Sequence, residues 1–248
     1  MSATEAFFAS RAMQALEVLA FGPSTATQVA NELQVHPRTA RRLLNRMVHD
    51  GWIVRRDGPR PTYTPTMRIV ALAAQLAQRA PLVRHALELA EELYDGPGEA
   101  VHLAVPSYRS ALRLIRATPR AEGVLAARDL APANAIAAGK LLLAFRDPWR
   151  EVVLASPLTP VTEHTLTEPA ALRADLARAL ERGYALEEEE YRPGVRALAV
   201  PVHGDSGEVV AALALSLAGA STAALLERAD AVVATGEKLS ERLRREAA

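Results

Sequence analysis

Apolar positions in the first 66 residues recur at helical spacing in three short segments, and a strand pair follows them. The first helix is predicted over 5–21, where a Gly-Pro pair follows it. The second starts at Thr25, with Gln28 three residues later, which is the pattern of a capping box. The third opens with Pro37, a favourable first-turn residue. Short β-rich runs on both sides of a Gly-Pro turn then predict a β-hairpin over 52–64.

The remaining residues alternate helix and strand patterns. Helices are predicted over 66–80, 82–93, 135–145, 167–182 and 221–246, and strands over 99–105, 196–202 and 208–217. The last two strands flank a GDSG turn and form a hairpin. Hairpin connectivity among helices predicts an α+β domain around an antiparallel sheet. We expect a first domain over 1–65, a linker helix over 66–80 and a second domain over 81–248, with Pro81 at the boundary.

Two polar side chains stand where helix N-caps are expected. Asn134 directly precedes the helix predicted from residue 135. Thr167 precedes a helix that has Pro169 in its first turn and Gly183 just past its end.

Composition and charge narrow the class of protein. The 248 residues are 50% hydrophobic and 23% charged, as in folded proteins. The absence of cysteine excludes disulfides, thiolate zinc sites and a cysteine nucleophile. The longest nearly unbroken apolar stretch has 12 residues, whereas a membrane-spanning helix needs about 20, and no signal-peptide pattern opens the chain. We therefore expect a soluble, cytoplasmic protein without a membrane partner.

The helix that begins at Pro37 carries a basic face. At about 100° per residue, its basic residues and Asn45 fall within an arc of about 140°, and its apolar residues fill the opposite arc. A capped helix, a short turn and a second helix with a basic face form a helix-turn-helix, which places its second helix in the major groove of DNA. The hairpin adds three arginines, as a wing along the DNA backbone does. The predicted DNA-binding residues are Arg38, Thr39, Arg41, Arg42, Asn45, Arg46, Arg55, Arg56 and Arg60.

Charge supports this assignment only through its placement. The chain has 29 basic and 29 acidic residues, but the basic excess lies in the N-terminal part, where residues 1–66 hold 8 basic and 5 acidic residues. Arginine is abundant throughout, so its total alone indicates no partner.

Four sequence segments resemble the IclR family of bacterial transcriptional regulators. They are TATQVANELQVHPRTARRLLNRMVHDGWIVRR from Thr25, AIAAGKLLLAF over 135–145, RGYALEEEEYRPGVRALAVPV over 182–202, and GEVVAALALSLAG over 207–219. The resemblance covers nearly the whole chain. It implies a winged helix-turn-helix, a linker helix, a GAF/PAS-like effector-binding domain, and dimers or tetramers.

The same resemblance implies an effector pocket. Its positions match Ala137, Ala138, Glu187, Ala197 and Ser216. The chain departs from the family pattern at Ala214, where a second serine can occur, and at Ala137, where glycine is frequent. More methyl groups indicate a more apolar or larger effector. The Glu187 carboxylate favours a neutral or hydroxylated effector over a dianion.

Two alternative functions remain open. The first is an enzyme that uses the second domain's cleft, with the carboxylate run 187–190 and His203 transferring protons. Against it, the sequence shows no nucleophile–base pair, no phosphate-binding loop and no metal-ligand spacing among its six histidines, so we expect neither catalytic residues nor a metal or cofactor. The second is an architectural DNA-binding protein whose second domain only oligomerises and binds no effector.

One winged domain reads few base pairs, so we expect a homo-oligomer on a pseudo-palindromic operator with half-sites about one helical turn apart. Phe7, Phe8 and Leu16 are candidate interface residues. The helix over 66–80 is expected to carry the effector signal to the wings.

Overall fold

The computed structural model describes residues 3–20, 22–94, 96, 98–107, 109–117 and 130–247. The chain divides into two compact units, Met1–Arg79 and Ala80–Ala248, which are described separately. Within the described residues, every helix falls short of the length and apolarity that a membrane crossing requires.

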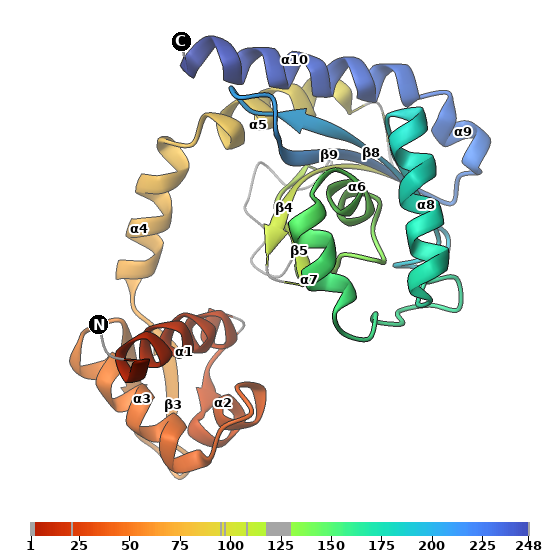
Figure 1. The fold of residues 1–248 in the computed structure, drawn as a ribbon. Helices are drawn as coiled ribbons and strands as arrows, with labels where there is room; N and C mark the ends of the chain where they lie inside the picture. Colours follow the sequence, from red (N-terminus) through yellow and green to blue (C-terminus); the bar gives the residue numbers. More distant parts are fainter. Residues whose placement is uncertain are drawn as a thin grey trace. The chain divides into compact units, whose positions relative to one another are not determined.

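The first unit consists of a helical cluster with a small sheet (Figure 1). Its elements are α1 (Ala3–Ala20), β1 (Ser24–Thr25), α2 (Ala26–Glu32), α3 (Pro37–His49), β2 (Ile53–Arg56), β3 (Thr62–Pro65) and α4 (Met67–Gln78). The strand order is β1-β3-β2, and both pairings are antiparallel. The predicted helix-turn-helix and its hairpin are therefore confirmed, and β1 adds a strand that the sequence pattern did not reveal.

Local signals explain the start of each helix in the helix-turn-helix. Thr25 caps α2, and the capping box with Gln28 forms as predicted. The N-cap of α3 is a histidine instead: His36 Nδ1 accepts a hydrogen bond from the Arg38 backbone N–H at 3.2 Å. The buried face of α3, which includes Leu43 and Leu44, packs into the unit's core.

The second unit is an antiparallel sheet between two layers of helices (Figure 1). Its elements are α5 (Pro81–Leu93), β4 (Glu99–Ser107), β5 (Ser110–Ala117), β6 (Leu130–Pro132), α6 (Ala137–Phe145), α7 (Asp147–Leu154), α8 (Pro169–Arg182), β7 (Ala185–Glu188), β8 (Val195–His203), β9 (Val209–Ala218), α9 (Thr222–Leu226) and α10 (Ala229–Ala247). The strand order is β6-β5-β4-β9-β8-β7. The predicted α+β class and the β8–β9 hairpin are confirmed.

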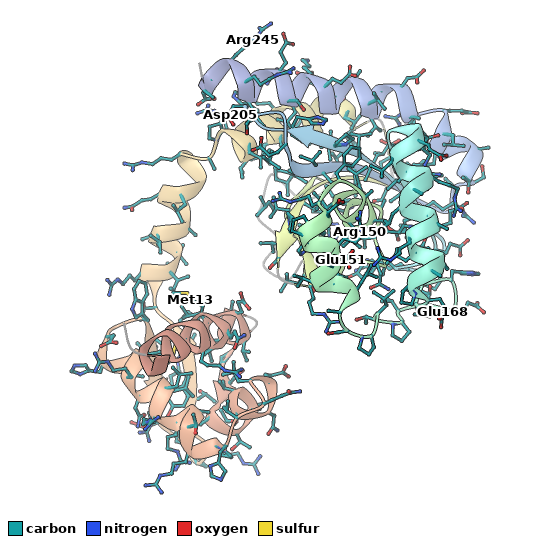
Figure 2. All side chains as sticks on the ribbon, in the orientation of Figure 1. Met13, Arg150, Glu151, Glu168, Asp205 and Arg245 are labelled. Atoms are coloured by element: carbon teal, nitrogen blue, oxygen red, sulfur yellow. The ribbon has the colours of Figure 1, made fainter. Side chains whose placement is uncertain are left out.

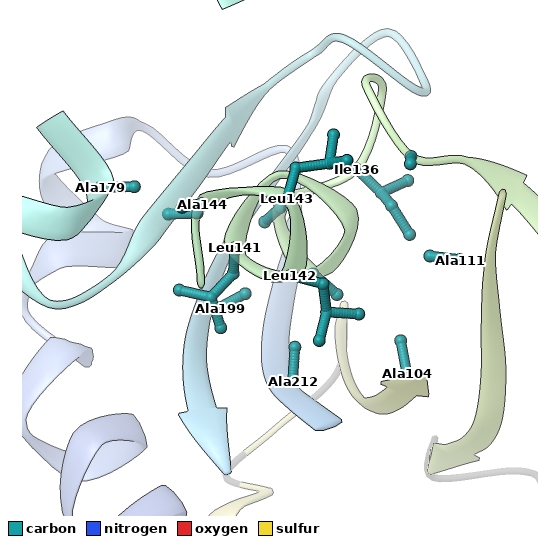
Figure 3. Packing of buried hydrophobic residues seen from close by; sticks show 14 of the residues in the cluster. Ala104, Ala111, Ile136, Leu141, Leu142, Leu143, Ala144, Ala179, Ala199 and Ala212 are labelled. Carbon is teal, nitrogen blue, oxygen red and sulfur yellow. The ribbon is translucent and has the colours of Figure 1, made fainter. Parts of the chain in front are cut away.

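Alternation along β9 separates two cores. Leu213, Leu215 and Leu217 face the core shared with α5 and α10, while Ala212 and Ala214 face the core shared with α6. This division follows the predicted alternation of large and small residues. On the α6 side the helix leucines pack over alanines of the sheet (Figure 3). Elsewhere in this unit, Arg173 on α8 forms an ion pair with Glu151 on α7 at 3.2 Å. Glu151 lies beside Arg150 on α7 (Figure 2).

Three sequence predictions about helix boundaries are wrong. Thr167 does not cap α8, because the N-cap is Glu168 and no side chain makes a capping hydrogen bond. Asn134 does not cap α6; its amide donates to the carbonyls of Thr159 and Leu166 at 3.0 Å each, while Ile136 is the N-cap. The single helix over 221–246 is instead two helices, α9 and α10, with Ser221 as the N-cap of α9.

Close backbone approach at Gly139 fixes the position of α6. A Cβ added there would lie 2.3 Å from the carbonyl oxygen of Ala133. We expect Gly139→Ala to lower the free energy of unfolding by about 1–3 kcal/mol, because backbone rather than a flexible side chain must move. Urea denaturation followed by circular dichroism measures the change. Gly96→Ala is the matched control, since an added Cβ there meets no atom within 4 Å. Equal losses in the two variants would contradict the packing argument.

Candidate functional site

The basic face predicted on α3 is exposed in the structure. Arg38, Arg41, Arg42, Asn45 and Arg46 are exposed. Thr39 is half-buried, and Arg46 forms an ion pair with Asp50 at 3.0 Å.

A recess joins part of this face to the wing. It has a volume of about 880 Å³ and is lined by residues of α2, α3 and the β2–β3 hairpin. Four predicted DNA-binding residues meet there: Arg41, Asn45, Arg55 and Arg60. The other five, Arg38, Thr39, Arg42, Arg46 and Arg56, do not line the recess. The geometry therefore presents a cationic surface made of the helix and the wing together.

A second cavity, of about 700 Å³, lies in the second unit beside the N-terminus of α6. All five predicted effector-pocket residues line it: Ala137, Ala138, Glu187, Ala197 and Ser216. Strand register explains how distant segments meet, because Ser216 on β9 pairs with Ala197 on β8, which pairs with Glu187 on β7. The small side chains leave space above the sheet, as the sequence predicts.

Glu187 is the buried acid of this cavity. Its Oε2 accepts a hydrogen bond from the Ala137 backbone N–H at 3.3 Å, while its Oε1 has no hydrogen-bond partner among the described residues. Burial raises the pKa of Glu187 to about 7, with a further contribution from the charge of Glu190, whereas the Ala137 N–H and Lys140 oppose the rise. The Glu187 carboxyl group therefore titrates near neutral pH.

This raised pKa gives a pH-dependent stability. The pKa in the folded state, about 7, lies above the ordinary value of 4.5, so folding is penalised increasingly as pH rises between these values. From about pH 5 to about pH 8 we expect wild-type stability to fall by roughly 2–3 kcal/mol relative to Glu187→Gln. Urea denaturation of both proteins across this range measures the difference. Parallel stability curves would show that Glu187 titrates normally.

The structure adds a histidine–serine pair that sequence reasoning missed. His102 Nε2 lies 3.0 Å from Ser216 Oγ, and both residues line the cavity. Burial lowers the pKa of His102 to about 3, assisted by the positive charges of Arg113 and two further arginines, so the ring is neutral at pH 7. Ser216 Oγ also donates to the Ala100 carbonyl at 3.2 Å, an arrangement in which His102 donates its Nε2 proton to the serine.

Three arginines, also missed, line the same cavity. Arg113 and Arg116 come from β5 and Arg192 from the β7–β8 connection. The Arg113 guanidinium stacks over the ring of Tyr191 at 5.1 Å, and Arg192 lies over the same ring at 5.6 Å. The cavity is therefore cationic at these residues, a feature that the motif comparison did not predict.

A buried ion cluster lies close enough to Glu187 to act on its pKa. Lys140 on α6 places its Nζ 2.5 Å from Glu190 Oε1 and 2.9 Å from Asp175 Oδ2. Burial raises the pKa of Glu190 against the opposing effect of Lys140. Burial acts the same way on Asp175, but Lys140 and Arg178 together outweigh it and lower the pKa of Asp175. Of the run 187–190, only Glu187 and Glu190 are buried.

The structure does not assemble the enzyme site considered from the sequence. His203 does not line the cavity that contains Glu187. His102 and Ser216 lie within hydrogen-bonding distance, with the histidine donating to the serine, and the sequence did not reveal this contact. However, the pKa of His102 makes it a weak base, and its Nδ1 has no described partner that would orient it. Within the described residues, no three acidic or histidine side chains gather as metal ligands.

Family models match both units. Residues 9–57 match the IclR helix-turn-helix domain, and residues 74–241 match the C-terminal domain of the bacterial transcriptional regulator IclR. The HTH-type transcriptional regulator BhcR of Paracoccus denitrificans is 30% identical over 93% of this chain and 85% of that protein. The HTH-type transcriptional regulator KdgR of Escherichia coli is 28% identical over 77% of this chain and 73% of that protein.

Solved structures share the fold. A Silicibacter regulator of the IclR type, 24% identical, aligns with a TM-score of 0.82 over 96% of each chain. An IclR homologue from Microbacterium hydrocarbonoxydans, crystallised with 4-hydroxybenzoate, is 27% identical and aligns with a TM-score of 0.73 over 96% of this chain and 99% of that chain.

Proposed function

Because the chain belongs to the IclR family of transcriptional regulators, we propose that a small molecule in the 700 Å³ cavity controls how tightly the winged domain binds an operator of a catabolic operon. The protein is a DNA-binding transcriptional regulator. The observation that carries the effector proposal is the cavity itself, because residues from α6, β7, β8 and β9 line one space that contains a buried, incompletely bonded carboxylate.

The nine predicted residues of α3 and the wing contact DNA in this proposal. Bases are read by Arg41, Arg42 and Asn45 on the exposed face of α3. The wing arginines Arg56 and Arg60 bind phosphates, which supplies affinity for any sequence. The recess supports DNA binding by this surface as a whole, because Arg41 and Asn45 of α3 meet Arg60 of the wing there.

In this proposal, two copies of the chain bind the two half-sites of a pseudo-palindromic operator. Four apolar side chains of α4, namely Met67, Val70, Leu72 and Leu76, are 45% to 75% exposed and support an interface there. Of the interface residues expected from the sequence, Leu16 instead packs partly into its own unit's core. The side chains of Phe7 and Phe8 lie outside the described residues. In this proposal, the linker helix α4 transmits the effect of ligand binding in the second unit to the winged domain.

Operator binding in the presence of candidate effectors tests the function. An operator is first selected from random DNA, and fluorescence anisotropy then gives its Kd with and without each compound. An effector is expected to change Kd by about 5- to 150-fold, the usual range of allosteric coupling. Compounds that bind the protein and leave Kd unchanged would instead support the architectural alternative.

We propose that the cavity binds its ligand without converting it. The neutral His102 is a weak base, and Ser216 can give its proton to the Ala100 carbonyl rather than to the histidine. Incubation of the full chain with a bound effector, followed by mass spectrometry, should return the compound unchanged. Steady conversion that Ser216→Ala abolishes would favour the enzyme.

A further inference from the structure

We infer that Arg228 is the positioning residue that couples the cavity to helix α5, and through α5 to the linker helix α4. The inference rests on the proposed function, since it names the side chain through which a ligand in the cavity acts on the winged domain. Arg228 lies between α9 and α10. It is neither a lining residue of the cavity nor one of the predicted DNA-binding residues.

One guanidinium group joins the cavity wall to the end of α5. Arg228 Nη1 forms an ion pair with Glu99, which is the first residue of β4 and lines the cavity. Its Nη2 donates to the carbonyl of Leu93, the last residue of α5, at 2.8 Å. The Arg228 and Glu99 side chains are 22% and 10% exposed, so water screens their pair only in part. Because the guanidinium donors are fixed in one plane, a movement of the Glu99 carboxylate also changes the bond to Leu93.

The C-terminal end of α5 belongs to the cavity wall as well. Its C-cap residue, Tyr94, lines the cavity together with Glu99. The last carbonyls of a helix have no partner within the helix, and a cation beside them is favoured by the helix dipole. Arg228 supplies that cation to α5. A ligand that contacts Tyr94 or binds the Glu99 carboxylate therefore changes how firmly this helix end is held.

Three ion pairs hold α5 in one register along α10. They are Glu92–Lys238 and Glu88–Arg242 at 2.6 Å each, and Arg84–Glu246 at 2.5 Å. On both helices these residues are spaced by four, so each row lies along one face. A shift of α5 by one turn would bring Arg84 opposite Arg242. A shift the other way would bring Glu88 opposite Glu246. Each exposed pair alone adds little stability, but the signs of the row oppose sliding, so α5 and α10 move together.

The connection from α5 to the linker helix is short. α4 ends at Gln78 and α5 begins at Pro81, so two residues separate the helices in the chain. Two residues span at most about 7 Å, which leaves little slack to absorb a movement of α5. The coupling therefore runs from Glu99 through Arg228 to α5, and from α5 through this connection to α4.

Reciprocity gives a test that requires no known effector. If the cavity is coupled to DNA binding, operator binding must also change the region around the cavity. Hydrogen–deuterium exchange with mass spectrometry is measured on the full chain, free and saturated with the selected operator, with a duplex of scrambled sequence as the reference. In the wild type, we expect the operator to change the exchange rates of amides in α5 and in the first half of β4 by about fivefold or more, the lower end of the usual range of coupling.

Three variants separate coupling from structural weakening. Arg228→Gln should abolish the operator-dependent change, because glutamine cannot pair with the Glu99 charge and bond to α5 at once. Arg196→Gln is the matched control: the 25% exposed Arg196 side chain likewise joins a carboxylate, that of Glu189, to a carbonyl, that of Ala220. Neither of these partners belongs to α5 or lines the cavity, so this variant should keep the change. Glu99→Gln breaks the Arg228 pair from the cavity side, should also abolish the change, and decides the matter if Arg228→Gln does not fold.

The outcomes distinguish this inference from the proposed function. An operator-dependent change that survives in Arg228→Gln, or in Glu99→Gln, would overturn the inference and leave the proposed function standing. Loss of the change in Arg196→Gln as well would also overturn it, because any weakening of the unit would then have the same effect. A wild type in which the operator changes no exchange in α5 or β4 would overturn the inference, while the effector titration of operator affinity decides the proposed function separately.

Discussion

Replacing Lys140 with methionine is expected to lower the free energy of unfolding by about 3–5 kcal/mol, the usual cost of breaking a buried ion cluster from one side. Lys140 is 1% exposed, and its ammonium group lies between Glu190 and Asp175. Methionine fills similar space but leaves the buried Glu190 without its counter-charge and Asp175 with Arg178 as its remaining partner. The cluster joins α6 to α8 and to the segment after β7, so its loss also weakens the attachment of α6 to these two segments.

The only other lysine of the chain provides the control. Lys238 pairs with Glu92 at 2.6 Å, with side chains 49% and 56% exposed, and Lys238→Met should cost at most about 1 kcal/mol. Urea denaturation at two pH values measures both variants. The loss in Lys140→Met should shrink in acid, because protonation neutralises the carboxylates whose charge Lys140 no longer balances. Equal losses in the two variants, or a loss that ignores pH, would show that the buried cluster is not stabilised by this charge.

Local patterns were sufficient for most elements of the fold. The capping box at Thr25 and the alternation of β9 depend on residues close in sequence, and both form as expected. The capping predictions at Asn134 and Thr167 are wrong, and for Asn134 the reason is a contact with residues distant in the sequence. The Asn134 side-chain amide instead donates hydrogen bonds to the carbonyls of Thr159 and Leu166, which are distant in the sequence. A capping pattern, which depends on neighbouring residues alone, does not predict such bonds.

The residues of the candidate cavity also fall into two groups, those that a sequence motif predicts and those that only the folded sheet brings together. Short motifs located Glu187 and Ser216, because the family pattern surrounds them in the sequence. Arg116 was missed because pairing between strands brings it to the cavity: it lies opposite His102 in the register of β5 with β4. The β5 sequence mixes arginines with apolar residues, and a β-bulge between Leu103 and Ala104 shifts the pairing. Only the folded sheet brings such residues to one space.

The double variant Arg41→Ala/Arg42→Ala is expected to weaken operator binding by about 2–6 kcal/mol, at about 1–3 kcal/mol for each base-reading arginine. Both side chains are exposed, and neighbouring Leu43 and Leu44 are buried, so the substitutions remove interactions with DNA and spare the core. Fluorescence anisotropy on the selected operator and on an operator with altered half-sites measures affinity and specificity together. The variant should discriminate poorly between these two DNAs.

Wing substitutions should behave differently, and the contrast is the test of the two roles. Arg56→Ala/Arg60→Ala should weaken binding to both DNAs alike and reduce the slope of log K against log salt by about 2, because each arginine neutralises one phosphate and accounts for about one unit of that slope. Arg173→Ala, which changes a residue of the second unit, should alter neither quantity. If the α3 variant keeps its specificity while the wing variant loses it, the hairpin reads the bases and the assignment of α3 as the recognition helix is wrong.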